Sequence, residues 1–173
     1  MNMPIIESGM SFGPFIDGHC FYIEKSVTYK KIEKNVQMAE FILLRYKTGK
    51  PPTVWVIEAK SSSPHPDTFP GFDEFICEIK EKLNNALVLG VAACLNRHST
   101  AHNELSEQFK TLDLSIVDFK LILVIKGHKA EWLPPLQDAL TKVLHPTVKT
   151  WALSALSVMV MNDDIARSYG LIS

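Results

Sequence analysis

The chain has 173 residues, of which 46% are hydrophobic and 21% are charged, so it is long enough to form one domain with a substantial core. Its formal net charge of −1 excludes a chain that binds nucleic acid through overall basicity, because any such contact would need a local basic patch. Three cysteines without CxxC spacing favour free thiols in a reducing compartment. With no signal-like or bilayer-length apolar segment, the sequence predicts a cytoplasmic protein that does not insert into membranes.

The first part of the chain predicts three strands. Residues 20–29 combine aromatic and β-branched residues with polar interruptions, which is typical of a strand that continues or bends through residues 30–35. Residues 38–46 predict a second strand, and a loop with Gly49 and two prolines separates it from a third strand at residues 53–61. The third strand is rich in large apolar residues, which favours a central position in the sheet.

The remainder alternates helices with strands. Apolar positions in residues 72–95 recur at spacings of three and four, which predicts a long amphipathic helix whose latter part, apolar all round, is buried. Residues 96–113 predict a loop with a short helix, and residues 119–127 predict a strand that runs parallel to an earlier strand after the helical crossover. The last predicted elements are a helix at residues 136–144, a strand at residues 153–161 and a helix at residues 163–171 capped by Asn162.

The predicted order is β, β, β, α, β, α, β, α. It indicates an α/β fold whose mixed sheet contains an antiparallel hairpin followed by parallel strands, with helices on its faces. We expect residues 1–173 to form a single domain, with Trp55, Trp132 and Trp151 as core or interface anchors.

Two charged residues end the third strand, where an apolar core would be expected to continue. Because side chains alternate along a strand, Glu58 and Lys60 share one face. If the second and third strands pair about Gly49, Glu40 lies opposite Glu58, since each is nine residues from that glycine. Directly opposed carboxylates are destabilising unless a positive charge lies between them, and a divalent cation supplies that charge. A register slip of one residue would turn Glu40 to the other face.

This combination resembles the PD-(D/E)XK nuclease superfamily, in which an acid precedes one strand and the next strand ends in acid-x-lysine before a helix and a parallel strand. The matching residues are Glu40, Glu58 and Lys60, although the family's first acid is an aspartate after proline. The resemblance covers roughly residues 15–127 and implies a restriction-endonuclease-like mixed sheet flanked by helices. Residues 131–173 would then be a C-terminal helix–strand–helix extension of the same domain.

The resemblance also implies a metal site and its chemistry. Mg²⁺ (or Mn²⁺) would be held by Glu40, Glu58 and the backbone carbonyl of Ala59, while Lys60 would orient or activate the attacking water. Many members of the superfamily carry an additional acid on an N-terminal helix, and Glu24 or Glu33 could supply it or replace Glu40. Oxygen ligands suit Mg²⁺, which neutralises developing phosphoryl charge, and a neighbouring lysine can stabilise hydroxide or phosphate.

The implied function is metal-dependent hydrolysis of DNA phosphodiester bonds. Because the net charge is near zero, we expect a nuclease subunit of a larger restriction or defence assembly, as a homodimer or a hetero-oligomer. The alternative is a non-catalytic interaction or regulatory protein on the same scaffold. In that case Glu58 and Lys60 form an ordinary ion pair at the strand end, worth about 0–1 kcal/mol if exposed.

Other charged patterns have simpler interpretations. His98 and His102 have the spacing of helical metal ligands but lack an intervening glutamate, which favours surface histidines. The basic run at residues 30–34 either follows a nucleic-acid backbone or is a solvated hairpin, and residues 126–129 either contact phosphate or end a strand in solvent. The acid-x-lysine triplet at residues 78–80 lies on a helical pattern and is not assigned to the site.

Overall fold

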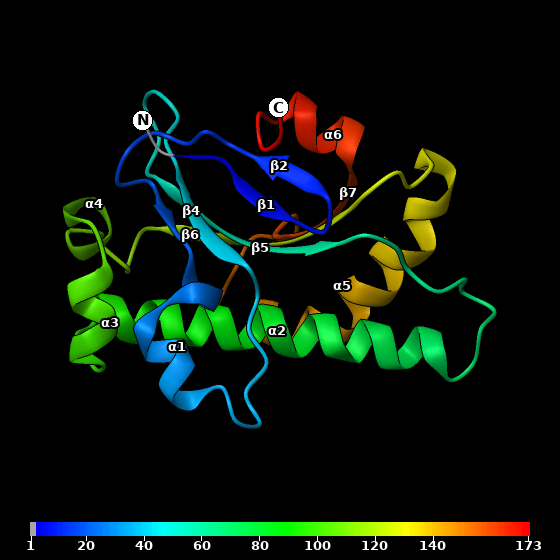
Figure 1. Ribbon diagram of the computed structural model, residues 1–173, viewed down its shortest axis with the longest axis horizontal. Coiled ribbons are helices and arrows are strands. Elements are labelled where there is room, and N and C mark those ends of the chain that lie inside the picture. Colours follow the sequence, from blue (N-terminus) through cyan, green and yellow to red (C-terminus); the bar gives the residue numbers. More distant parts are fainter. Residues whose placement is uncertain (1–2) are drawn as a thin grey trace.

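A mixed five-stranded sheet forms the centre of the molecule in a computed structural model that describes residues 3–173 (Figure 1). The strand order is β3-β4-β5-β6-β7. The strands are β3 (Cys20–Phe21), β4 (Phe41–Arg45), β5 (Thr53–Lys60), β6 (Asp118–Ile125) and β7 (Val158–Asn162). Strands β3, β4 and β5 are antiparallel, whereas β5, β6 and β7 are parallel. The predicted α/β class and mixed sheet are therefore confirmed.

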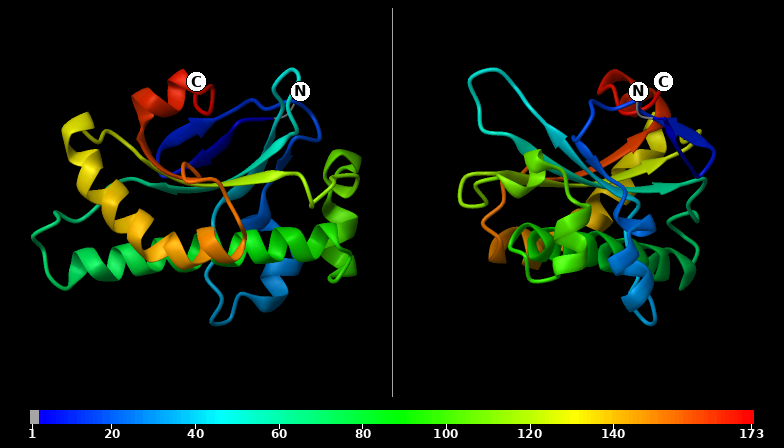
Figure 2. Two further views of the ribbon diagram at one scale, coloured as in Figure 1. Left: turned by 180° about the vertical axis from the view of Figure 1, so that it is seen from behind. Right: turned by 60° about the vertical axis from the view of Figure 1, so that its left-hand side comes forward.

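Each face of the sheet is covered by a different layer (Figure 2). Helices α2 (Gly71–Cys94) and α5 (Leu133–Thr150) lie on one face, and a hairpin of β1 (Ile5–Glu7) and β2 (Met10–Phe12) lies on the other with helix α6 (Asp163–Ser168). Val54 and Val56 join the core under the helices, while Trp55 and Ile57 join the core under the hairpin. Strand β5 is buried on both sides, as its apolar composition predicts.

The other short elements lie around this framework. They are the 3-10 helices η1 (Ile23–Lys25) and η2 (Ala130–Trp132) and the helices α1 (Val27–Ile32), α3 (Ser99–Glu104) and α4 (Glu107–Lys110). Asn162 caps α6 as predicted, because its side-chain oxygen accepts a hydrogen bond from the Ile165 amide at 2.9 Å. Within residues 3–173, none of the helices has the length and apolar content needed to cross a bilayer.

Two local predictions are wrong, and one pair of strands was missed. Residues 20–29 form a strand only at Cys20–Phe21 and then turn into η1 and α1. Ser26 caps α1, and the Glu104 carboxylate accepts the Val27 amide at 2.8 Å from 77 positions away, a contact that no local pattern reveals. The β1–β2 hairpin was not predicted. The latter part of α2 is also not wholly buried, since Val88 is 55% exposed on the side away from the sheet.

The side chain of Gln137 covers the open edge of β7. Its amide nitrogen donates to the Val158 carbonyl at 3.0 Å, and its amide oxygen accepts the Val160 amide at 2.8 Å. An unpaired strand edge is a template for pairing with another chain, so this side chain both satisfies the backbone and blocks the edge.

We predict that Gln137→Ala lowers the free energy of unfolding by about 1–3 kcal/mol, because two backbone groups lose their partner. Urea denaturation monitored by circular dichroism measures the change. Lys142→Ala, an exposed substitution on the same helix, is the control and should change stability by less than about 0.5 kcal/mol. Equal stability of the two variants would contradict a stabilising role for Gln137.

Candidate metal site at the end of the central strand

Strand β5 carries Glu58 and Lys60 to its carboxyl end on the face that packs against α2. The Glu58 side chain is completely buried, and the Lys60 ammonium lies 3.5 Å from its Oε1 atom. Lys60 also donates to the Glu78 carboxylate on α2 at 2.6 Å. Glu58 and Lys60 therefore share a face as predicted, but the Lys60 ammonium lies closer to Glu78 on α2 than to Glu58 on its own strand.

Helix α2 adds a second lysine that the sequence analysis did not assign to the site. Lys82 donates to Glu58 Oε1 at 2.9 Å, and it lies one helical turn after Glu78. Burial raises the pKa of Glu58, and the charges of Lys82 and Lys60 act against that rise. Burial acts to lower the pKa of Lys82, but the charges of Glu58, Glu40 and Glu78 and the hydrogen bond to Glu58 together raise it.

The pairing of β4 with β5 has the predicted register. Phe41 lies opposite Ile57 and Ile42 opposite Val56, so the pairing is centred on Gly49. Glu40 lies just before β4, and its amide donates to the Ile57 carbonyl at 3.0 Å. Glu40 and Phe41 therefore both lie opposite Ile57, which is the arrangement of a β-bulge. A bulge changes the direction in which a side chain points.

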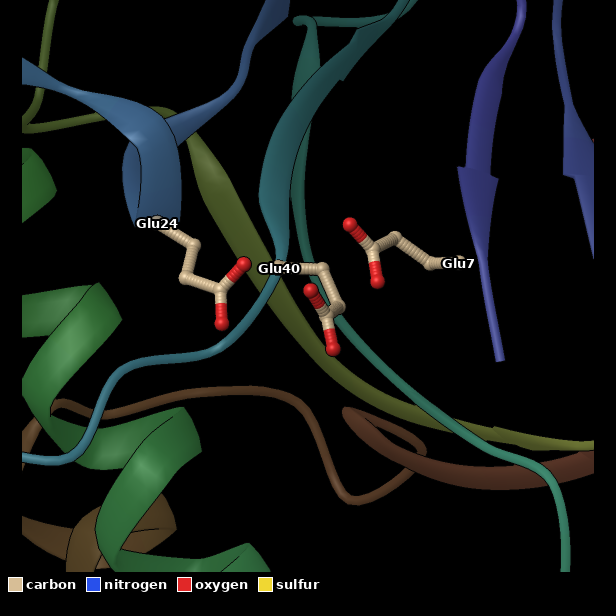
Figure 3. Close-up of side chains that lie close together, drawn as sticks. All are labelled: Glu7, Glu24 and Glu40. Carbon is tan, nitrogen blue, oxygen red and sulfur yellow. The ribbon is translucent and has the colours of Figure 1, made fainter. Parts of the chain in front are cut away.

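The bulge places Glu40 in a cluster of acids (Figure 3). Glu7 at the end of β1, Glu24 in η1 and Glu40 each offer a carboxylate oxygen, and these oxygens lie within 4.8 Å of one another. The Tyr22 hydroxyl donates to Glu7, and Lys25 donates to Glu24 at 2.7 Å. Neither of these hydrogen bonds reaches Glu40.

Glu40 shows the electrostatic consequence of this crowding. Burial raises its pKa from 4.5 to about 8, and the nearby charges of Glu58, Glu24 and Glu7 contribute to the rise. The residue is 5% exposed. Oε2 of Glu40 and Oε2 of Glu58 are both buried without a hydrogen-bond partner among residues 3–173. Such atoms are costly to bury and are rare in folded proteins.

This donor set fits a hard divalent cation. The available groups are carboxylate oxygens and a backbone carbonyl, which are the ligands that Mg²⁺ and Mn²⁺ prefer. The Ala59 carbonyl accepts the Ser8 hydroxyl at 3.0 Å, and a carbonyl oxygen has a second lone pair that remains available. Glu40 and Glu58 each keep one buried carboxylate oxygen without a hydrogen-bond partner among residues 3–173, and the charge of Glu58 acts on Glu40.

The predicted site residues lie in two neighbouring groups. Glu58 pairs with Lys60 at the end of β5, whereas Glu40 joins Glu24 and Glu7, and the charge of Glu58 acts on Glu40. Of the two acids considered as an addition, Glu24 and not Glu33 belongs to the acid group. Glu78, whose triplet was set aside, contacts Lys60 directly. Of the two histidines with helical metal-ligand spacing, His102 has its Nδ1 atom 2.9 Å from the Ala93 carbonyl, and His98 is the N-cap residue before α3.

Two residues of the site were missed, for different reasons. Lys82 follows Glu78 by one turn and lies beside the buried positions Ile79 and Leu83, so its helical phase was a usable signal. Glu7 had no such signal, because it reaches the cluster through a hairpin that packs on the sheet from outside the motif.

Comparisons with known proteins add no further assignment. No protein-family model matches the chain, and none of the curated proteins or solved structures is detectably similar to it. The site is therefore interpreted from its own geometry.

We predict that the metal-free protein loses stability as the pH rises from about 4.5 to about 8. In this window the unfolded chain ionises Glu40 while the folded protein keeps it protonated, so the folded state binds more protons and the free energy of unfolding falls. The fall should amount to a few kcal/mol at most, at about 1.4 kcal/mol per pKa unit. Urea denaturation at several pH values in EDTA measures it.

Glu40→Gln should flatten this pH dependence and equal or exceed the wild type in stability at pH 8, because the amide does not ionise. Glu33→Gln is the matched control, since Glu33 is exposed and lies outside the acid cluster. Identical pH profiles for the wild type and Glu40→Gln would contradict the buried, protonated state of Glu40.

Proposed function

We propose that the chain is a metal-dependent nuclease that hydrolyses DNA phosphodiester bonds on a restriction-endonuclease-like fold. One observation carries this proposal: Glu40 and Glu58 each keep a buried oxygen without a hydrogen-bond partner among residues 3–173, and two lysines lie beside Glu58 at the end of β5. Burying such oxygens without a partner lowers stability, so their presence favours a ligand that binds them.

The order of elements supports the same proposal. An antiparallel β4–β5 hairpin, the helix α2 and the parallel strand β6 follow one another in the order that the PD-(D/E)XK resemblance implies. Glu40 immediately precedes β4, and Glu58 and Lys60 lie at the carboxyl end of β5, which supports the same assignment. The arrangement differs in its additional acids, because Glu24 lies in a 3-10 helix and Glu7 in a hairpin.

Each residue has a distinct part in this proposal. Glu40, Glu58 and the Ala59 carbonyl would hold Mg²⁺ or Mn²⁺, with Glu24 and Glu7 beside Glu40. When bound, the ion supplies charge neutralisation at the phosphoryl group and lowers the pKa of water. Lys60 places its charge beside Glu58 with 23% of its side chain exposed, where it can stabilise an attacking hydroxide or a phosphate oxygen.

Lys82 has a supporting part in the same arrangement. Its ammonium keeps Glu58 Oε1 compensated and leaves Oε2 as the oxygen without a partner. Breaking a buried ion pair by removing one partner costs about 3–5 kcal/mol, so Lys82 stabilises the carboxylate in the form that a cation requires.

The net charge of −1 bears on the biological setting. A nuclease that binds DNA alone generally uses a basic surface to attract the phosphate backbone. We therefore propose that this chain is the nuclease subunit of a restriction or defence assembly, in which another subunit supplies most of the DNA affinity.

A second candidate function is a non-catalytic interaction or regulatory protein on the same scaffold. The ion-pair geometry favours it: Glu58 Oε1 already receives two lysines, and Lys60 is held by Glu78 at 2.6 Å. In this case the charged groups form a structural cluster. Calorimetric titration with Mn²⁺ discriminates between the two functions, since a structural cluster has no requirement for the ion.

We predict that the protein nicks or linearises plasmid DNA with Mg²⁺ or Mn²⁺ and is inactive in EDTA. Glu58→Ala, Lys60→Ala and Glu40→Gln should each reduce the cleavage rate at least about 100-fold, the scale of losing a preorganised charged group. Glu40→Gln and Glu58→Ala should also weaken the calorimetric Mn²⁺ signal, because each removes a ligand.

Glu81→Gln and Lys80→Ala are matched controls on α2, because they change an acid and a lysine that lie outside the cluster. Both should cleave as the wild type does. Unchanged activity of folded Glu58→Ala and Lys60→Ala would exclude this site. The absence of both Mn²⁺ binding and cleavage would instead favour the regulatory function.

A further inference from the structure

A pocket lies beyond the carboxyl ends of β5 and β6. It has a volume of about 400 Å³ and is formed by the loop after β5 and the turn and first residues of α5 after β6. The two segments lie at the same end of the molecule in Figure 1 and in the reversed view of Figure 2. In open α/β sheets, ligands bind in crevices outside the carboxyl ends of parallel strands.

The walls of this pocket are held by contacts from several elements. The buried Asn162 side chain donates to the His128 carbonyl at 2.8 Å, and the Gly127 amide donates to Asp163 at 2.8 Å. The His128 ring packs edge-on against Trp132 with 5.2 Å between ring centroids, and its Nε2 lies 3.4 Å from the Ser63 hydroxyl. The pocket is therefore part of the packed structure.

The lining has two chemical characters. Trp132 with Pro64, Pro66 and Pro135 provides flat apolar walls, and 47% of Trp132 remains exposed. Polar side chains of Ser63, His128 and Glu131 also line it and can exchange hydrogen bonds with a ligand. A flat conjugated ring with polar edges matches both characters, and a nucleobase is such a ring.

The pocket lies close in sequence to Glu58 and Lys60, which together with Lys82 we call the acid–lysine cluster. Ser63 follows Lys60 by three residues, a span of at most about 10 Å, and DNA bases are separated by about 3.4 Å along a strand. A strand with its phosphate at Lys60 can therefore bring a base from a few positions away to Trp132.

We propose that this pocket binds one unpaired nucleobase of the DNA strand whose phosphate lies at the cluster, an inference that rests on the proposed nuclease function. The substrate class is then DNA with an unpaired or extruded base near the cleaved bond. Stacking on an aromatic side chain is sequence-tolerant, so Trp132 would recognise the absence of pairing more than the identity of the base.

The test is anisotropy of an end-labelled single-stranded oligonucleotide in EDTA, where cleavage does not contribute. The 173-residue chain should bind it more tightly than an abasic oligonucleotide of equal length or its duplex. Trp132→Ala should weaken binding by about five- to 150-fold, the effect of removing one base–aromatic stack, and Trp132→Phe should restore part of the affinity. Trp151→Ala, which changes another exposed tryptophan outside this pocket, should bind as the wild type does.

The outcomes separate this inference from the nuclease proposal. Equal binding of the abasic and ordinary oligonucleotides, or no effect of Trp132→Ala, would overturn the base pocket even if plasmid DNA is cleaved. Competition by free adenosine monophosphate at the same concentration as the oligonucleotide would overturn its assignment to a DNA strand. If the protein binds bases through Trp132 but cleaves no plasmid, the base pocket is supported and only the nuclease function is contradicted.

Discussion

The buried carboxylate of Glu58 is the constraint on which this structure depends. It ends a strand that is covered on both faces, where an uncompensated charge would cost several kcal/mol. Lys60 from the same strand and Lys82 from α2 compensate one of its oxygens. The position of α2 on the sheet is thus set by charge as well as by apolar packing. The second oxygen, Oε2, is buried without a hydrogen-bond partner among residues 3–173, and the same is true of Glu40 Oε2.

The motif and its framework could be predicted because the signals are local. Alternation along β5 placed Glu58 and Lys60 on one face, and the centring of the loop on Gly49 gave the observed register of β4. The local turn of Glu40 could not be predicted, since the bulge against Ile57 depends on η1 and the hairpin around it. Glu7 was out of reach for the same reason. The strand expected over residues 20–29 failed because Glu104 stabilises a helix there from a distant segment.

Both proposed binding features follow from one property of the topology. Strands β5 and β6 are parallel, so their carboxyl ends open at the same edge of the sheet. Glu58 pairs with Lys60 and Lys82 at the carboxyl end of β5, and the Trp132 pocket lies where β5 and β6 lead into their following segments. The proposed metal site and the proposed base pocket therefore both lie at the carboxyl ends of these strands.

The most direct test of this account is the anomalous scattering of crystals soaked in Mn²⁺. The account predicts one strong peak between Glu40 and Glu58, with carboxylate oxygens of both residues at about 2.0–2.2 Å, the range of small divalent cations. Loss of that peak in Glu40→Gln crystals would agree with it. A Mn²⁺ peak elsewhere, or no peak while Glu58 keeps both lysines, would show that the cluster is structural and would contradict the central claim.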